Sequence, residues 1–194
     1  MISTVVFAHP WYGSFNKAIL DAVGKSYEQR GKEYRVIDLN KEDFDPVLHD
    51  DELKVYSKGQ SVDDKVKKYQ ELLKGSDELI FVFPIWWFSL PAILKGFIDK
   101  VMLKGFAYEE GKIRLIGLLG NIRKTALITT SEFPTWYIRL IVGDPISSFI
   151  RGTMRSVGLK RVKWYNNDMT TTGSVNKRKR FLKKIETYCK NAGE

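Results

Sequence analysis

Three short segments of the sequence contain residue types that could bind a phosphate group or a flat aromatic ring. The first, HPWYGSFN at residues 9–16, places Gly13, Ser14 and Asn16 directly before a stretch with helical apolar spacing. Free backbone N–H groups at the start of a helix, together with the helix dipole, favour an anion such as phosphate. A capped helix that binds nothing would show the same residues, so this segment alone favours neither interpretation.

The second segment, FPIWWFSLPA at residues 83–92, carries three consecutive aromatics where polar turn residues normally follow a strand: Trp86, Trp87 and Phe88. These rings cannot all point into the core beneath them. Some must line a concave surface, which suits a flat aromatic cofactor or substrate. A subunit interface anchored by tryptophan explains them equally well, and both interpretations can hold together.

The third segment, TTSEFPTWY at residues 129–137, adds the hydroxyl groups of Thr129, Thr130 and Tyr137. A generic polar turn with a Trp-Tyr anchor would have the same composition. The three segments together are rich in aromatics and poor in acids and bases. A bound flavin, which brings its own reactive chemistry, explains that balance better than side-chain catalysis does.

Motifs of several other enzyme classes are absent from the sequence. There is no G-x-G-x-x-G dinucleotide fingerprint, no G-x-x-x-x-G-K-[ST] loop and no G-x-S-x-G. His9 and His49 stand without His or Cys at metal-ligand spacing, so no metal site is expected. Cys189 falls on the apolar face of the last predicted helix, which favours packing over a nucleophilic role.

The composition is that of an ordinary globular protein, and one domain is expected to span residues 1–194. No apolar run approaches the roughly 18 residues of a membrane span, so no membrane insertion is expected. The N-terminal residues resemble a strand rather than a signal peptide. A single cysteine fits a reducing compartment, and a cytoplasmic location is expected.

Basic residues outnumber acidic ones by 32 to 23, which gives a formal net charge of +9. The densest basic cluster, residues 177–180, precedes apolar residues with helical spacing, so it is interpreted as the solvent face of a final helix. No RNA- or DNA-binding motif accompanies it. We therefore expect no nucleic-acid partner.

Strand and helix patterns alternate along the whole chain. Strands are expected at residues 1–8, 34–39, 78–83, 125–130 and 160–165, and helices with apolar faces within 15–27, 66–73, 94–102, 146–157 and 181–189. This alternation predicts an α/β fold, a doubly wound five-stranded parallel sheet with helices on both faces. Ligands bind beyond the carboxyl ends of such strands, where all three segments lie.

Three motifs in this order resemble those of the flavodoxin-like NAD(P)H:quinone reductases, the group that includes DT-diaphorase and many small bacterial members. They are H-P-W-Y-G-S-F-N-K-A, F-P-I-W-W-F-S-L-P-A-I-L-K-G-F-I-D-K-V and I-T-T-S-E-F-P-T-W-Y, and the second is the most specific. The resemblance covers nearly the whole chain. It implies a flavin-dependent enzyme that passes two electrons from NAD(P)H, a transient co-substrate, to a quinone-type acceptor in a ping-pong reaction.

The resemblance also implies which residues bind the cofactor. The first segment would hold the phosphate end of the flavin, the second the isoalloxazine edge, and the third the region around flavin O2. Tyr137 matches a tyrosine implicated in stabilising the reduced ring. The implied binding residues are His9, Ser14, Phe15, Asn16, Pro84, Ile85, Trp86, Trp87, Phe88, Thr129, Thr130, Ser131, Glu132 and Tyr137.

The sequence departs from the best-known members at several positions. Ser131 and Glu132 replace two glycines, and Val142 stands near the position of a histidine that would partner the tyrosine. Tyr137 is therefore expected to donate a hydrogen bond rather than take part in a proton relay, and Glu132 to point away from the ring. The loop after the second strand, which in larger members touches the adenine half of FAD, is also shorter. Because small bacterial relatives resemble FAD binders as well, FAD is the expected cofactor, with FMN as the alternative.

A homodimer is expected from Trp86, Trp136 and the apolar residues 138–142, and the resemblance implies an active site shared across the interface. Two other functions stay open. A flavodoxin-type electron carrier would be strongly acidic, which the charge of +9 opposes. A regulatory subunit of a potassium efflux system, as in some relatives, is compatible with the sequence. The acceptor itself, whether quinone, azo compound or nitroaromatic, is not specified.

Overall fold

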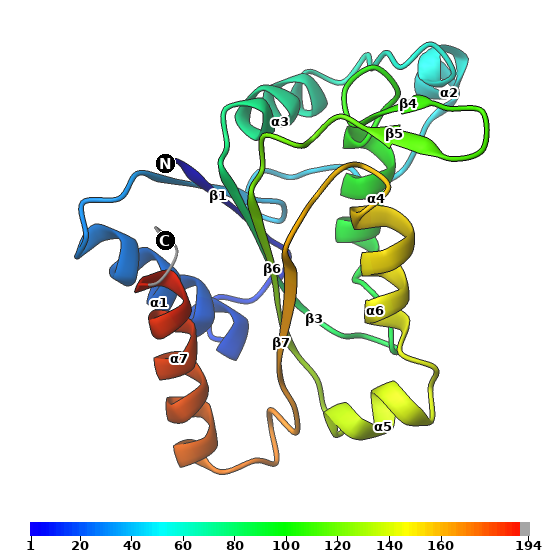
Figure 1. The fold of residues 1–194 in the computed structure, drawn as a ribbon. Helices are drawn as coiled ribbons and strands as arrows, with labels where there is room; N and C mark the ends of the chain where they lie inside the picture. The colour runs from blue at the N-terminus through cyan, green and yellow to red at the C-terminus, as the bar shows by residue number, and fades with distance from the viewer. Residues whose placement is uncertain (191–194) are drawn as a thin grey trace.

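A parallel sheet forms the centre of the molecule in the computed structural model, which describes residues 1–190 (Figure 1). Its five strands lie in the order β2-β1-β3-β6-β7. They are β1 (Ser3–Phe7), β2 (Tyr34–Asp38), β3 (Glu78–Pro84), β6 (Lys124–Thr130) and β7 (Val162–Asn167). The predicted doubly wound sheet is thereby confirmed. The strand order reverses between β1 and β3, which places a ligand crevice at the carboxyl ends of these strands.

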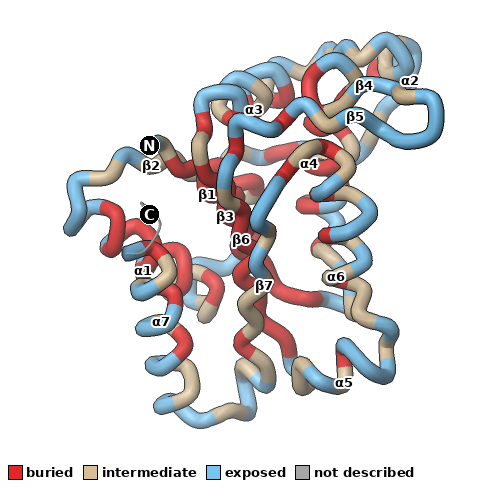
Figure 2. The backbone as a smooth tube through the Cα atoms, in the orientation of Figure 1, coloured by how far each residue is buried: buried red, intermediate tan, exposed pale blue. Residues whose placement is uncertain are grey.

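Helices cover both faces of this sheet. On one face α1 (Phe15–Glu28) packs beside α7 (Val175–Lys190). The other face is covered by α3 (Asp64–Lys74), α4 (Ala92–Val101) and α6 (Pro145–Phe149), and α6 continues into a π-helical turn at Ile150–Met154. Figure 2 shows the buried residues running along the strands, with exposed residues on the outer sides of the helices.

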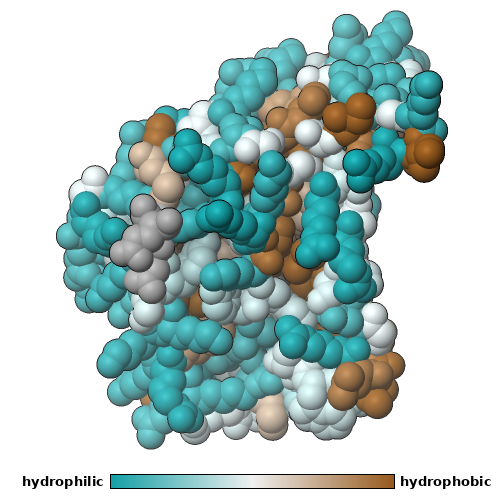
Figure 3. Space-filling view, in the orientation of Figure 1, coloured by the Kyte–Doolittle hydropathy of each residue, from teal (hydrophilic) through white to brown (hydrophobic). Residues whose placement is uncertain are grey.

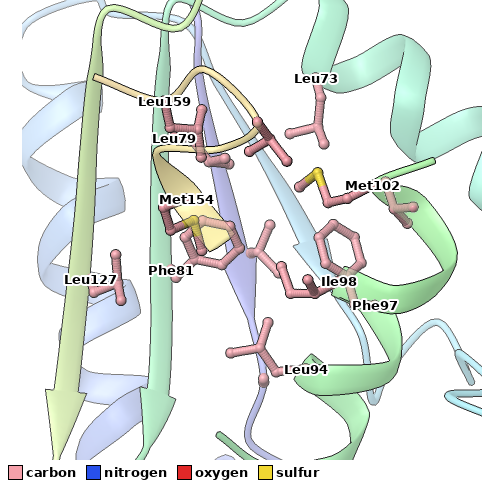
Figure 4. Packing of buried hydrophobic residues seen from close by; sticks show 14 of the residues in the cluster. Leu73, Leu79, Phe81, Leu94, Phe97, Ile98, Met102, Leu127, Met154 and Leu159 are labelled. Atoms are coloured by element: carbon pink, nitrogen blue, oxygen red, sulfur yellow. The ribbon is translucent and has the colours of Figure 1, made fainter. Parts of the chain in front are cut away.

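Every residue of β3 is buried, as its nearly continuous apolar run predicts for a central strand. Phe81 of β3 pairs with Val6 of β1 and Leu127 of β6, which places it in the middle of the sheet. Figure 4 shows Phe97 and Leu94 of α4 in the same cluster as Phe81. This packing fixes the start of α4, and with it the segment that joins β3 to α4.

Four short elements were not predicted: α2 (Asp50–Tyr56), β4 (Tyr108–Glu110), β5 (Leu115–Gly117) and α5 (Thr135–Leu140). Both helices bury a single residue, so neither produces an apolar period that could be recognised in the sequence. A buried ion pair holds α2 instead, because Nζ of Lys100 in α4 lies 2.9 Å from a carboxylate oxygen of Glu52. β7 begins later than predicted, after Arg161, which has a left-handed backbone (φ 49°).

The surface is mainly hydrophilic on the face shown in Figure 3, and two of its apolar groups lie at protruding parts of the chain. The first is the tip of the β4–β5 hairpin, where Ile113 is 99% exposed. The second lies over the end of α5, where Leu140 and Ile141 are 77% and 63% exposed. Within residues 1–190, no helix has both the length and the apolar character needed to cross a bilayer.

Candidate functional site

Two adjoining cavities open at the carboxyl ends of β1, β3 and β6. We call the smaller one, of about 200 Å³, the polar cavity; its walls are His9, Trp11, Ser14, Phe15, Asn16, Pro84, Ile85, Trp86, Thr130, Ser131, Glu132, Thr170 and Thr171. The larger one, of about 540 Å³, is called the aromatic cavity; its walls are Ile85, Trp86, Trp87, Phe88, Ser131, Glu132, Phe133 and Ile138. The structure therefore brings all three predicted segments together at one place.

The polar cavity lies at the start of α1. Ser14 caps this helix, and its hydroxyl accepts a hydrogen bond from the backbone N–H of Lys17 at 3.2 Å. Asn16 is only 3% exposed, and its side-chain amide donates to Thr130 Oγ1 at 2.9 Å. Its Oδ1 is buried without a hydrogen-bond partner among the described residues. A buried acceptor without a donor is costly, so this atom fits a ligand that supplies a donor.

His9 stands between the polar cavity and the aromatic segment. Its Nδ1 accepts a hydrogen bond from the backbone N–H of Trp11 at 3.1 Å, and its ring lies 5.9 Å from a ring of Trp86. Partial burial is the main reason that the pKa of His9 lies below its ordinary value. The imidazole is consequently neutral at pH 7, which leaves the positive end of α1 as the source of attraction for a phosphate.

The aromatic segment is a tight two-residue turn. Trp86 and Ser89 exchange backbone hydrogen bonds at 2.9 and 3.1 Å, and the two residues between them, Trp87 and Phe88, have φ angles of 48° and 58°. Positive φ is costly for large side chains, and such turns normally use Asn and Gly. The strained turn leaves Trp87 94% exposed, while Phe88 packs on Phe133 with ring centroids 5.0 Å apart. Strain of this kind is concentrated at functional sites.

Residues 131 and 132 are held by the chain that follows β7. The Ser131 hydroxyl donates to the Phe133 carbonyl at 2.8 Å and accepts from the Asn166 side-chain amide at 2.9 Å. The Glu132 carboxylate accepts hydrogen bonds from Thr171, from its backbone N–H at 3.3 Å and from its hydroxyl at 2.5 Å. Its carboxylate is thus directed at the loop between β7 and α7.

Two predicted residues do not line either cavity. Thr129 is fully buried, and its hydroxyl accepts from Trp164 Nε1 and donates to Asn166 Oδ1, both at 2.8 Å. Successive residues of a strand face opposite sides, so only Thr130 of this pair can face α1. Tyr137 lies behind Phe133, with ring centroids 5.4 Å apart, and its hydroxyl has no hydrogen-bond partner within residues 1–190.

Several lining residues were not anticipated from the sequence: Trp11, Phe133, Ile138, Thr170 and Thr171. Ile138 also corrects the expected exposed run at residues 138–142, because it is fully buried in the core. The last two threonines belong to the loop after β7. A fifth strand was expected at residues 160–165, and the hydroxyl-rich sequence M-T-T-T-G that follows it was the available signal.

Asp168 in this same loop connects three parts of the site wall. It accepts hydrogen bonds from the Thr135 backbone N–H at 2.7 Å and hydroxyl at 2.8 Å, and it pairs with Lys177 of α7. Burial raises the pKa of this carboxyl, but the bonds from Lys177 and Thr135 outweigh burial and the net pKa is lowered. Asp168 therefore stays ionised and fixes the start of α5.

Several known proteins are similar to this chain in sequence and in fold. Residues 1–191 match the family described as flavodoxin-like fold. An NAD(P)H oxidoreductase of Haemophilus influenzae, named uncharacterized, is 30% identical over 162 residues, which cover 82% of this chain and 80% of the relative. Smu.1420 of Streptococcus mutans has a TM-score of 0.87 at 32% identity, over 98% of this chain and 100% of that chain.

The NAD(P)H:quinone oxidoreductase of Methanothermobacter marburgensis has a TM-score of 0.85 at 25% identity, over 99% of this chain and 98% of that chain. The family match spans nearly all of the sequence, and the three motif segments converge on one crevice in the structure. The chain belongs to the flavodoxin-like NAD(P)H:quinone reductase family.

Proposed function

We propose that this protein is a flavoenzyme that transfers two electrons from NAD(P)H to a flat quinone-type acceptor. The observation that carries the proposal is the pairing of the polar cavity, at a helix start, with an aromatic cavity directly beside it. The first suits a phosphorylated ligand and the second a planar ring. A bound flavin would supply the redox chemistry, which the side chains of the site do not.

The residues have separate roles in this proposal. His9, Ser14, Phe15 and Asn16 would hold the phosphate end of the flavin, and Asn16 Oδ1 would accept a hydrogen bond from a hydroxyl group of the ribityl chain next to the phosphate. Pro84, Ile85, Trp86 and Phe88 would border the ring, together with Thr130, Ser131 and Glu132. Trp87 would cover the position that NAD(P)H and the acceptor occupy in turn, which is the basis of a ping-pong reaction.

The sequence is the basis for our proposals on the type of flavin, the oligomeric state, the location and the acceptor. FAD is the proposed cofactor and FMN the second choice. The active unit is proposed to be a cytoplasmic homodimer of single-domain chains, in which the exposed Trp136, Leu140 and Ile141 are covered by the partner. The acceptor is proposed to be a quinone, with azo compounds and nitroaromatics as flat alternatives.

Purified protein provides the test. We expect a flavin absorption spectrum, release of FAD or FMN on heating, and rapid oxidation of NADH or NADPH that depends on an added quinone. Reduction of the bound flavin by NAD(P)H alone separates an oxidoreductase from an electron carrier, which needs a reductase partner. A colourless protein that neither FAD nor FMN reconstitutes would contradict the proposal.

A further inference from the structure

A carboxylate stands on the wall that the two cavities share. Glu132 lines both of them, at the point where the polar cavity meets the aromatic cavity. Among the described residues that line either cavity, it is the only one with a formal charge at neutral pH, because the pKa of His9 is lowered by burial. The electrostatic character of an otherwise uncharged wall therefore depends on this side chain.

Hydrogen bonds hold Glu132 in place without neutralising it. Its carboxylate accepts from the backbone N–H and the hydroxyl of Thr171, which are both uncharged donors. A carboxylate can accept about four hydrogen bonds, so it keeps capacity for a ligand. Glu132 takes part in no ion pair within residues 1–190. The carboxylate is directed at the loop after β7, but because Glu132 also lines the aromatic cavity, its negative charge acts on a molecule bound there.

We propose that Glu132 makes the aromatic cavity select acceptors by charge, so that neutral or cationic ring compounds are favoured over anionic ones. The inference rests on the proposed function, because it takes the aromatic cavity to be the place where the acceptor binds. A carboxylate and an anionic substituent repel each other more strongly beside an apolar wall than in bulk water. An uncharged ring of the same shape meets no such repulsion.

Two matched aromatic probes that cannot be reduced by the enzyme test this directly. Naphthalene-2-sulfonate is anionic and naphthalene-2-sulfonamide is neutral, and both have nearly the same shape. Their dissociation constants would be measured by isothermal titration calorimetry on the purified flavin-loaded protein and on the Glu132→Gln variant. The glutamine keeps an oxygen that can accept from Thr171 while it removes the charge. We expect the variant to bind the sulfonate about threefold to tenfold more tightly and the sulfonamide within about twofold of the original protein.

Two controls distinguish an effect of the Glu132 charge at the cavity from an effect of the protein's net charge. Glu109→Gln changes the net charge equally but lies on the exposed β4 strand, and it should leave the ratio of the two constants unchanged. Raising the salt concentration to about 1 M should reduce the discrimination of the original protein but not that of Glu132→Gln. The same preference should appear in the kcat/KM values for 1,4-naphthoquinone and its 2-sulfonate.

The binding measurement distinguishes a failure of charge selection by Glu132 from a failure of the proposed function. If both proteins show the same ratio of sulfonate to sulfonamide affinity, Glu132 does not select by charge and the inference is wrong. If the ratio changes as expected but NAD(P)H reduces no quinone, the charge selection stands and the proposed function fails. Failure of both probes to bind the original protein would also overturn the inference, because the aromatic cavity would then not accept a flat ring.

Discussion

The side-chain amide of Asn16 donates to the hydroxyl of Thr130 across 2.9 Å and so joins the first turn of α1 to the last residue of β6. Both side chains are buried. The bond engages the amide nitrogen of Asn16, while its buried Oδ1 has no hydrogen-bond partner among the described residues. One hydrogen bond therefore orients a binding group and connects two of the three site segments.

Removing this bond should show coupling between the two residues. We expect Asn16→Ala and Thr130→Val each to lower the free energy of unfolding of the flavin-free protein by about 1 kcal/mol, and the double variant to lose less than the sum. Urea denaturation would give the free energy of unfolding of the original protein, of both single variants and of the double variant. Asn16→Ala should also weaken flavin binding about tenfold, because it removes the free acceptor as well. Strictly additive losses would show that the two side chains do not interact in solution.

The positive φ angle of Trp87 should lower the stability of the fold, while its aromatic ring should contribute to binding of the acceptor. Trp87→Asn relieves a positive φ angle at a side chain that is 94% exposed, so it should raise the free energy of unfolding by about 0.5–1 kcal/mol. The same variant should raise the KM for naphthoquinone severalfold, because one aromatic wall is lost. Phe88→Gly is the matched comparison. It relieves strain equally but removes the packing on Phe133, and it should destabilise the protein.

Tyr137→Phe tests whether the phenol contributes to the reaction. The ring stack on Phe133 survives this change, so flavin content should be unaffected. Loss of one hydrogen-bond donor should slow NADPH-dependent flavin reduction by roughly threefold to tenfold in stopped-flow measurements. An unchanged rate would make Tyr137 only a support for Phe133. A loss near a thousandfold would require a proton relay that the described residues do not provide.

Protonation of Glu78 should lower the free energy of unfolding of the protein at acid pH. It is fully buried at the start of β3, where it accepts hydrogen bonds from Ser3 at 2.6 Å and from Tyr27, Lys32 and Tyr188 at 2.8 Å. Burial alone raises the pKa of this carboxyl, but its donors outweigh burial and the net pKa is lowered from 4.5. A lowered folded pKa means that the ionised group stabilises the fold above pH 4.5 and that this contribution disappears as the pH falls further.

We expect Glu78→Gln to lower the free energy of unfolding at pH 7 by about 3 kcal/mol, since Lys32 loses its buried partner. The variant should also lose less stability than the original protein between pH 5 and about pH 3. Urea unfolding across this range measures both effects. Glu71→Gln removes an exposed ion pair with Lys74 and should change stability by less than about 0.5 kcal/mol. A parallel pH profile in both proteins would exclude Glu78 as the titrating group.

The exposed end of α5 should control assembly. Lysine at both Leu140 and Ile141 places charge on side chains that are 77% and 63% exposed, so a folded monomer tolerates the change but a buried interface does not. Sedimentation velocity at micromolar concentration should show a dimer for the original protein and a monomer for this variant. Leu53→Lys, on α2, is the matched exposed control and should stay dimeric. A monomeric original protein would contradict the proposed dimer.

The sheet could be predicted because its signals are local. Each central strand is a short apolar run between polar residues, and burial on both faces produces that pattern whatever the neighbours are. The lining residues Phe133, Thr170 and Thr171 could not be predicted in the same way, because their positions depend on loop conformation. Thr129, which the resemblance implies as a binding residue, lines neither cavity for a different reason. Strand alternation already excludes two adjacent threonines from one cavity, and the motif alone did not take this into account.

The wall of the polar cavity depends on residues that come late in the chain. Ser131 is held by backbone hydrogen bonds to Asn167 and Thr170, and Glu132 by Thr171, while Asp168 needs Lys177 of α7. A ribosome makes the turn at residues 9–16 first, but Ser131 and Glu132 in the opposite wall lack these hydrogen-bond partners until residues 167–171 have been synthesised. We therefore expect flavin uptake to come late in the biosynthesis of this protein, and chains that end before residue 167 to be colourless.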